Sequence, residues 1–287
     1  MALQPQNIYD DSAFFSAYGT LPRSQQGLSA APEWPDLRHM VLHDRLPVSD
    51  STDSTLALEG HRILDLGCGY GWFARWARDN GAAYVKAVDI SHKMICQAMQ
   101  FETNNPKGSS RSHLNSTSIG EINFEVGNIE SITFSDNNRE GGSYNIVYSS
   151  LAFHYVEDLA RLYREIHSCL EKRGKLVFSV EHPISSAPIH PGPDWKSLED
   201  EGGQEQKIWP LNCYSDEGWR VTSWLGVDGI RKYHRTVETY VKLLLENGFT
   251  LTGFKDWAPS IEDVAKHPEW TDERHRPYFL LICAEKK

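Results

Sequence analysis

The amino-acid sequence predicts an α/β fold built on a doubly wound, mainly parallel sheet. The first observation is a short apolar run, Ile63–Leu66, that leads directly into a glycine-rich turn and an amphipathic helix. The second is the alternation of such runs with helical patterns between residues 63 and 180, which is typical of βα units. The third is the length of 287 residues, which is enough to bury a full core as one enlarged domain.

Residues 63–71 read Ile-Leu-Asp-Leu-Gly-Cys-Gly-Tyr-Gly and predict a ligand-binding corner. The glycines allow positive φ angles and let the backbone approach a ligand where a Cβ would clash. The dinucleotide fingerprint needs a third glycine where Trp72 stands, and a P-loop needs a Gly-Lys-Ser/Thr run that does not follow. Asp65 suits a ligand with an ammonium and a sulfonium better than a pyrophosphate, which a carboxylate would repel. A glycine turn without a ligand is the alternative.

The elements after this corner follow in the order of βα units. A helix that begins at Trp72 carries an apolar stripe and ends at Asn80–Gly81. The strand Ala83–Val88 then ends in Asp89, and Ser91 caps the next helix. The remaining expected elements are the strand Tyr144–Ser149, the helix Leu159–Leu170, the strand Leu176–Val180, a helix over 237–245, and the strands Phe249–Phe254 and Tyr278–Ala284.

These motifs resemble those of the class I S-adenosylmethionine (SAM)-dependent methyltransferases of the methyltransferase-11-like type. The likeness rests on residues 64–71, on Asp89, on the segment Phe124–Ile129 and on the end of the strand Tyr144–Ser149. That strand end lacks the Asp/Asn-Pro-Pro-Tyr signature of enzymes that methylate base or glutamine nitrogens, and is similar to the small-molecule methyltransferases. The resemblance implies a Rossmann-like, seven-stranded sheet with an antiparallel last strand, SAM as methyl donor and S-adenosyl-L-homocysteine as product.

The resemblance also implies the residues that hold the cofactor. Asp89 would accept both ribose hydroxyls, although a strand-end Asp can also cap a helix. Asn128 stands where relatives carry Asp beside the adenine amine; its carbonyl can still accept that amine, and a plain turn Asn is the alternative. In many relatives an N-terminal helix covers the cofactor, and an Arg there can bind the methionine carboxylate in two places. The full expected set is Tyr9, Tyr18, Arg23, Asp65, Gly67, Cys68, Gly69, Gly71, Asp89, Ile90, Met94, Asn128, Ile129 and Ser149.

Methyl transfer from SAM chiefly requires alignment of donor and acceptor and exclusion of water. The candidate catalytic residues near the ends of the fourth and fifth strands are His154, Glu181 and His182. His154 is favoured because its ordinary pKa suits base chemistry near pH 7. A helix-capping or core-edge histidine is the alternative, and a thiol acceptor would need little more than positioning of its thiolate.

Residues 181–236 form a long insertion that carries four of the nine tryptophans. Wide aromatic surfaces line pockets for neutral, apolar ligands, but the tryptophans can equally form a small core of the insertion itself. The expected substrate residues are Phe14, Phe153, Trp195, Trp209 and Trp224. Within a single domain over 1–287 we expect an N-terminal helical lid at 1–46, the SAM-binding core at 60–180, this substrate-binding insertion, and closing elements at 237–287.

Composition restricts the partners to small molecules. A net charge of −10 without a basic stripe argues against a nucleic-acid partner. The N-terminus has no apolar leader segment, and no apolar run is long enough to span a membrane, so we expect a cytoplasmic, monomeric protein. The five cysteines are scattered without metal-ligand spacing, which indicates reduced thiols and no metal. Three polar tracts, Pro47–Gly60, Thr103–Gly120 and Ser135–Ser143, read as surface insertions.

Over nearly its whole length the chain is similar to one branch of these enzymes in bacteria and fungi. The segments that carry this likeness are Ile8–Asp10, Glu33–Pro35, Glu181–Ile184, His234–Thr236 and Arg276–Leu280. Among fungal members it resembles the S-methyltransferases of secondary metabolism that methylate both thiols of reduced, gliotoxin-type dithiol dioxopiperazines. O- or N-methylation of another small metabolite or quinone is the alternative, and a SAM-binding protein without catalysis is the alternative of another class.

Overall fold

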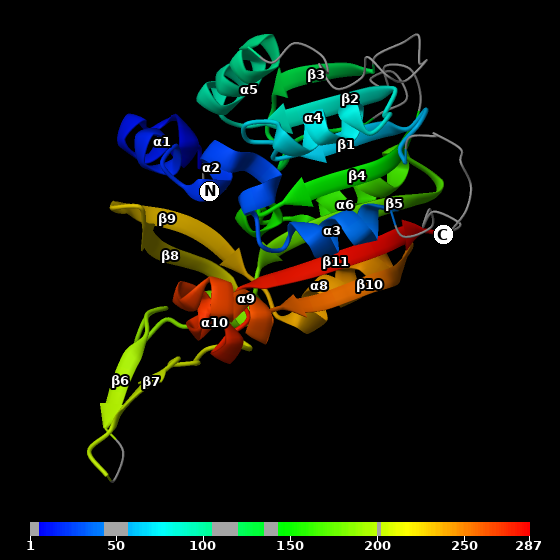
Figure 1. The fold of residues 1–287 in the computed structure, drawn as a ribbon. Helices are drawn as coiled ribbons and strands as arrows, with labels where there is room; N and C mark the ends of the chain where they lie inside the picture. Colours follow the sequence, from blue (N-terminus) through cyan, green and yellow to red (C-terminus); the bar gives the residue numbers. More distant parts are fainter. Residues whose placement is uncertain (1–5, 43–56, 105–119, 135–142, 200–201) are drawn as a thin grey trace.

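The computed structural model describes residues 6–42, 57–104, 120–134, 143–199 and 202–287. Most of each of the three polar tracts lies outside the described residues. In the described part a seven-stranded sheet has the order β10-β11-β5-β4-β1-β2-β3 (Figure 1). Its strands are β1 (Arg62–Leu66), β2 (Tyr84–Asp89), β3 (Glu121–Val126), β4 (Tyr144–Ser150), β5 (Leu170–Glu181), β10 (Phe249–Trp257) and β11 (Phe279–Lys286).

Strands β1 to β5 pair in parallel, whereas β11 runs antiparallel to both of its neighbours, β5 and β10. The expected Rossmann-like sheet with an antiparallel last strand is therefore confirmed. The largest difference in a strand boundary is at β5, which begins at Leu170 and not at Leu176; β10 also extends to Trp257 beyond the expected Phe254, and the other expected strands shift by one or two residues. Leu170 already pairs with Tyr144, and an irregularity follows in which Arg173 takes a positive φ of 63° before regular pairing resumes.

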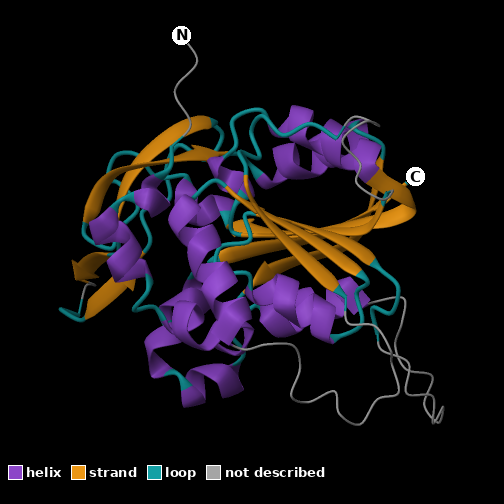
Figure 2. Cartoon of the chain, turned by 90° about the horizontal axis from the view of Figure 1, so that it is seen from above, coloured by secondary structure: helices purple, strands orange, loops and turns teal. Residues whose placement is uncertain are grey.

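Helices cover both faces of the sheet (Figure 2). On one face, α6 (Leu159–Cys169) and α8 (Val237–Glu246) pack on Leu64 and Leu66; on the other, α3 (Trp34–Leu42) and α4 (Trp72–Asp79) pack on Ile63. Because side chains alternate along a strand, Asp65 lies on the Ile63 face of β1. Near β2 and β3 lies α5 (His92–Asn104), whose N-terminus follows Asp89 directly.

The N-terminal segment consists of short helices beside the carboxyl ends of the parallel strands (Figure 1). They are η1 (Ile8–Asp10), α1 (Ser12–Tyr18), α2 (Pro22–Gln26) and η2 (Gly27–Ala30). Asp11 caps α1 by accepting hydrogen bonds from Ala13 N and Phe14 N, both at 2.9 Å. This segment contacts the sheet from the edge at which ligands bind in open α/β folds.

The insertion after β5 contains a short helix, α7 (Pro183–Ser186), and two separate antiparallel ribbons. The first ribbon, β6 (Lys196–Glu199) and β7 (Glu205–Ile208), projects from the body as an arm, and the second, β8 (Gly218–Trp224) and β9 (Val227–His234), lies beside the N-terminal helices (Figure 1). Between β10 and β11 come α9 (Ile261–Lys266), η6 (Pro268–Trp270) and α10 (Asp272–His275). Within the described ranges no helix has the length and apolar character needed to cross a membrane.

Candidate active site

A cavity of about 540 Å³ lies at the carboxyl edge of the parallel strands, a volume in the range of small-molecule sites. Its walls come from the N-terminal segment, the ends of β1 to β5, the start of β11 and the β8–β9 ribbon. The sheet order divides it into two halves. One half lies over β1, β2 and β3, and the other over β4, β5 and β11.

The glycine corner at the end of β1 forms the floor of the first half. Gly67 has a φ of +75°, and a Cβ there would stand 2.4 Å from the Ala152 Cβ, so packing alone requires glycine. Gly69 has a φ of +52° and also lines the cavity, but a Cβ there would meet no atom within 4 Å. The backbone at Gly69 is therefore bare toward the cavity and open to a ligand.

Two buried acids, Asp65 and Asp89, stand on either side of this corner. Asp89 accepts hydrogen bonds from Gly69 N at 2.8 Å and from Ser91 N at 2.9 Å, one on each oxygen. Burial raises the pKa of Asp89 to about 6, although both N–H donors favour its ionised form. Each of its oxygens keeps a further lone pair for a ligand hydroxyl.

Asp65 is only 2% exposed, and its Oδ2 has no hydrogen-bond partner among the described residues. Burial, and then the carboxylate of Asp89, raise the pKa of Asp65 well above its usual range. A buried acceptor without a partner is costly, so this atom needs an explanation. A cationic donor bound in the cavity, which Asp65 lines, would provide the missing partner.

Asn128 lines the far end of the first half, beyond β3. Its Oδ1 accepts a hydrogen bond from Glu130 N at 2.9 Å, and its carbonyl oxygen accepts one from Ile132 N at 2.9 Å. The side chain therefore fixes a turn, as the alternative interpretation of this residue expects. One lone pair of Oδ1 and the amide N–H groups are left for a ligand.

The second half of the cavity is aromatic, and Glu181 lies at its end. Its lining includes Trp34, Tyr148, Trp219, Trp224, Tyr278 and Phe279. Glu181, at the end of β5, accepts a hydrogen bond from Lys232 Nζ of β9 at 2.5 Å. Burial by itself would raise the pKa of Glu181, but the Lys232 ammonium holds it below its usual range.

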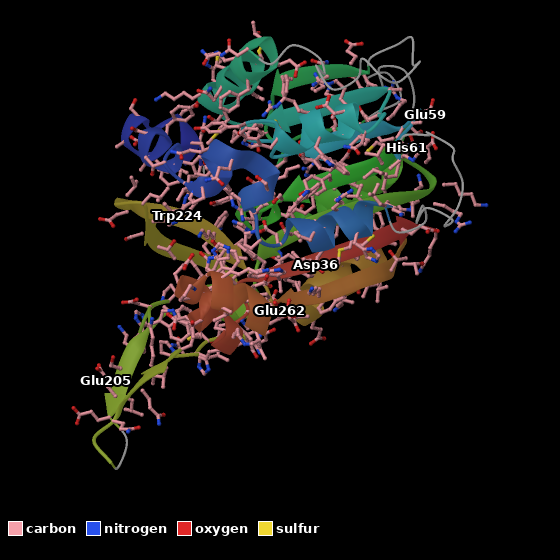
Figure 3. The ribbon with its side chains drawn as sticks, in the orientation of Figure 1. Asp36, Glu59, His61, Glu205, Trp224 and Glu262 are labelled. Atoms are coloured by element: carbon pink, nitrogen blue, oxygen red, sulfur yellow. The ribbon has the colours of Figure 1, made fainter. Side chains whose placement is uncertain are left out.

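The N-terminal segment and the β8–β9 ribbon meet over this cavity. The ring of Trp224, labelled in Figure 3, lies 5.5 Å from that of Phe14 and 6.2 Å from that of Tyr18. The hydroxyls of Tyr9 and Tyr155 form a hydrogen bond at 3.2 Å. Arg23 donates through Nη2 to both oxygens of the buried Glu33, at 2.9 and 3.0 Å, which leaves its other guanidinium nitrogens to donate elsewhere.

The structure brings most of the predicted cofactor residues together and fewer of the others. The predicted residues that line the cavity are Tyr9, Tyr18, Arg23, Asp65, Gly67, Cys68, Gly69, Asp89, Ile90, Met94, Asn128, Ile129, Glu181 and Trp224. The predicted residues that do not line it are Gly71, Ser149, His154, His182, Phe14, Phe153, Trp195 and Trp209. Five of these eight, Gly71, Ser149, His154, His182 and Phe153, are adjacent in sequence to a residue that lines the cavity, whereas Phe14, Trp195 and Trp209 are not.

The two histidines have structural partners in place of a substrate. His154 Nδ1 accepts a hydrogen bond from Glu181 N at 3.3 Å, and burial lowers the pKa of His154 to about 4. His182 caps α7 by accepting from Ile184 N at 3.1 Å, while its Nε2 lies 2.9 Å from Asp256 Oδ1. The geometry therefore favours the capping and core-edge roles for both histidines over that of a general base.

The remaining predicted residues outside the cavity belong to the packing around it. Gly71 is the left-handed cap of α4, where a Cβ would stand 2.6 Å from the Phe124 ring, and Ser149 Oγ donates to Leu66 O at 2.7 Å. Phe14 and Phe153 are fully buried, Phe153 within the core beside α6. Trp195 and Trp209 meet edge to face at the base of the β6–β7 arm, with ring centroids 5.3 Å apart.

Several residues that line the cavity could not be identified from the sequence pattern of the strand or helix to which they belong. Tyr148 lies on β4 and Trp34 at the start of α3, and both rings face the cavity from different elements. Tyr278 and Glu33 lie in segments that carry the family likeness, which is the signal that could have marked them. No group of three or more His, Cys, Asp or Glu side chains in the described part could hold a metal ion.

Comparison with known proteins gives the family. A family model described as a methyltransferase domain matches residues 64–178. The solved structure of a SAM-dependent methyltransferase from Mesorhizobium loti is 36% identical, with a TM-score of 0.70, over 91% of this chain and 100% of that one. An uncharacterised protein of Haemophilus influenzae is 29% identical over 98% of this chain and 97% of its own length.

A more distant relative has a named activity. The ubiquinone biosynthesis O-methyltransferase of Neisseria meningitidis serogroup C is 27% identical over 52% of this chain and 57% of that enzyme. The match spans little more than half of that enzyme, whereas the Mesorhizobium protein is matched over its whole length at more than 30% identity. The chain belongs to the SAM-dependent methyltransferases.

Proposed function

We propose that this methyltransferase acts on a neutral, largely apolar small molecule, and that the methylated atom is a thiol sulfur. The single observation that carries the proposal is the second half of the cavity, where aromatic rings surround Glu181 and this acid is already paired with Lys232. A paired acid adds little net charge, so an aromatic or otherwise apolar acceptor fits better than a cationic amine.

The first half of the cavity fits SAM on the observations of this structure. The unpartnered Asp65 Oδ2 matches the ammonium of the methionine part, and the free lone pairs of Asp89 match the ribose hydroxyls. Ile90, Met94 and Ile129 supply apolar wall toward Asn128, where the adenine would lie. The remaining donors of Arg23 suit the methionine carboxylate. When bound, SAM supplies a methyl group that its sulfonium has activated.

The support for a thiol comes from the acid–base groups around the second half. Glu181 is a weak base, because Lys232 holds its pKa low, and the His154 Nδ1 lone pair is engaged by Glu181 N–H. Of the other carboxylates that line the cavity beside this half, Glu33 is paired with Arg23, Asp158 accepts a hydrogen bond from Arg161 N, and Glu157 is exposed. A thiol, with an ordinary pKa of about 8.5, ionises without such help, whereas an aliphatic hydroxyl does not.

Within this class we propose a reduced dithiol dioxopiperazine of the gliotoxin type as the acceptor. The support is the resemblance to the fungal S-methyltransferases that we infer from the sequence, together with an aromatic cavity suited to a rigid, apolar ring system. A second candidate is O-methylation of a quinol, which the partial likeness to the Neisseria ubiquinone enzyme favours. A phenolic hydroxyl is less acidic than a thiol, so this candidate needs more help from a base.

The experiment has two stages. Calorimetry first measures the affinity for SAM of the wild-type chain, of Asp89→Ala and of Glu262→Gln, an acid on the distant helix α9 (Figure 3). An acceptor panel of reduced gliotoxin, a hydroquinone and an alkylamine then reports added methyl groups by mass. We expect SAM binding that only Asp89→Ala abolishes, and methylation of the dithiol. Methylation of the hydroquinone alone would replace the thiol by the second candidate, and SAM binding without transfer to any acceptor would leave a non-catalytic SAM-binding protein.

A further inference from the structure

Both ends of the β6–β7 arm are anchored on one buried arginine. Trp195 precedes β6 and Trp209 follows β7, and the Arg276 guanidinium lies 5.2 Å from the first ring centroid and 4.1 Å from the second. Arg276 is only 6% exposed, although the arm itself extends into solvent (Figure 1). The two tryptophans that the sequence assigns to the substrate thus contact a cation outside the cavity.

Arg276 also contacts a residue of the cavity wall. Its guanidinium lies 5.0 Å from the ring centroid of Tyr278, and Tyr278 lines the cavity. Nη2 donates to both carboxylate oxygens of Glu273 at 3.0 and 3.1 Å, while the buried Nε has no hydrogen-bond partner within the described chain. The cation therefore depends on the faces of the surrounding rings for part of its stabilisation.

Tyr278 belongs to the second half of the cavity. Tyr278 directly precedes β11. The sheet order places β5 and β4 between β11 and β1, so at the usual strand spacing β11 lies about 14 Å from β1, the strand that leads into the glycine corner. Its carbonyl oxygen accepts a hydrogen bond from His182 N at 2.8 Å, next to Glu181. The nearby Glu181 carboxylate, with burial, raises the pKa of Tyr278, so its hydroxyl stays protonated beside that acid.

We propose that Arg276 is a positioning residue of the acceptor site, and that it couples the β6–β7 arm to Tyr278. This inference rests on the proposed function, since it concerns how the same cavity holds its acceptor. The stack of Trp195, Trp209, Arg276 and Tyr278, here called the arginine stack, fixes the Tyr278 ring from outside the cavity. Loss of the arm-side rings frees the guanidinium to move, and Tyr278 then loses its defined place in the acceptor wall.

The test compares variants of the full chain that alter one layer of the arginine stack. Trp209→Leu removes a ring face, whereas Trp209→Phe keeps a ring but loses the hydrogen bond from Nε1 to Ile184 O at 2.9 Å. Arg276→Met removes the charge, and Arg276→Lys keeps a charge in case the Met variant does not fold. The matched control is Trp270→Leu, which removes a tryptophan stacked on His267, with ring centroids 4.1 Å apart, outside the arginine stack.

The first measurement is steady-state kinetics with reduced gliotoxin at saturating SAM. We expect Trp209→Leu to raise the acceptor KM about tenfold, the size of a buried cation–π contact, without a change in the affinity for SAM. Trp209→Phe and Trp270→Leu should stay close to wild type. In the Arg276→Met background, Trp209→Leu should add little, because the two residues act through one stack. Additive effects, or an unchanged KM for Trp209→Leu, would overturn the coupling.

A second measurement does not depend on catalysis. The chain is labelled with 3-fluorotyrosine, and the ¹⁹F resonance of Tyr278 is assigned by its loss in Tyr278→Phe. Trp209→Leu should shift or broaden this resonance in the wild-type background but not in Arg276→Met, and Trp270→Leu should leave it in place. If the resonance does not respond to Trp209→Leu, the tryptophans only anchor the arm. A chain that methylates no acceptor but shows this response would overturn the proposed function and retain the coupling.

Discussion

The backbone N–H of Gly69 donates a hydrogen bond to Asp89 Oδ2 at 2.8 Å. This contact ties the bare middle of the glycine corner to the end of the neighbouring strand β2. The same carboxylate holds the N-terminus of α5 through Ser91 N. The Asp89 side chain therefore positions both the floor of the cavity and the wall beside it. We expect substitutions at Asp89 or Gly69 to reduce the affinity for the cofactor more than they reduce the stability of the fold.

Alanine at Gly69 should separate cofactor binding from stability. A Cβ there would meet no protein atom but would point into the cavity, at a φ of +52° that costs a non-glycine residue about 1 kcal/mol. We expect Gly69→Ala to fold with a slightly lower melting temperature and to bind SAM at least tenfold more weakly by calorimetry. The comparison is Gly67→Ala, whose Cβ would clash with Ala152 and should lower stability more. Unchanged SAM affinity in Gly69→Ala would contradict the placement of the cofactor over this corner.

The affinity for SAM should depend on pH through Asp89. Its pKa of about 6 in the free protein means that the carboxylate is ionised above pH 6 and protonated below it. Only the ionised form accepts hydrogen bonds from two hydroxyls, so the affinity for SAM should fall as the pH drops through 6. Well below this pKa the affinity should fall about tenfold for each pH unit. Calorimetry between pH 5 and 8 measures this slope. Asp89→Asn should bind weakly throughout and lose the step near pH 6; a step that persists in this variant would have to come from another group, such as Asp65.

The strands and the cofactor corner can be predicted from the sequence, whereas the acceptor side cannot. The glycine corner is a local signal, because the run that contains Asp65, the glycines and Asp89 are close in sequence. The glycines allow the turn and the close approach of a ligand, and the two acids stand near the ends of strands. A residue that follows a strand, such as His154, lies near the site, but its direction depends on the turn it occupies. His154 points to Glu181 N, and not into the cavity.

Aromatic content is a weak guide for a related reason. Trp195 and Trp224 are equally apolar in the sequence, and only the pairing of their ribbons decides that one contacts Arg276 while the other reaches the cavity. Of the four tryptophans of the insertion, Trp219 and Trp224 line the cavity, whereas Trp195 and Trp209 pack against each other and against Arg276. Contacts between elements far apart in the chain, such as Glu181 with Lys232, leave no periodic trace in the sequence from which they could be predicted.

Asp10 should control how long the cofactor stays bound. From the N-terminal segment it accepts hydrogen bonds from Ser91 Oγ at 2.6 Å and Lys93 N at 3.0 Å, and so caps α5 from a distant part of the chain. Its neighbours Ile8 and Tyr9 line the cavity. Asp10→Ala should lose about 1 kcal/mol of capping energy and release this segment. We expect faster dissociation of S-adenosyl-L-homocysteine in stopped-flow experiments and faster amide exchange over η1 and α1.

The control for Asp10 is its neighbour Asp11. Asp11→Ala removes a cap of similar strength, but that cap belongs to α1 itself and does not reach α5. It should lower the stability of α1 and leave the dissociation rate of S-adenosyl-L-homocysteine close to wild type. Equal acceleration by both variants would mean that general loosening of the N-terminal segment, and not the contact with α5, sets the rate.

Removal of Lys232 should destabilise the folded chain strongly. Lys232 and Glu181 are 10% and 17% exposed at their side chains, so Lys232→Met leaves a nearly buried carboxylate without its cation, at a cost of about 3–5 kcal/mol. The pKa of Glu181, now held low, should rise, and the variant should lose more stability at pH 7 than at pH 4, where the acid can take up a proton. Urea unfolding at both pH values measures this difference in the free energy of unfolding.

The double variant Glu181→Gln/Lys232→Met should recover most of the loss, because no charge is then buried alone. The control is Lys242→Met, which breaks an exposed pair with Glu246 and should change the free energy of unfolding by less than about 1 kcal/mol. A loss in Lys232→Met that is the same at both pH values, or that the double variant does not recover, would show that lost packing against Trp224, and not the ion pair, stabilises this end of the cavity.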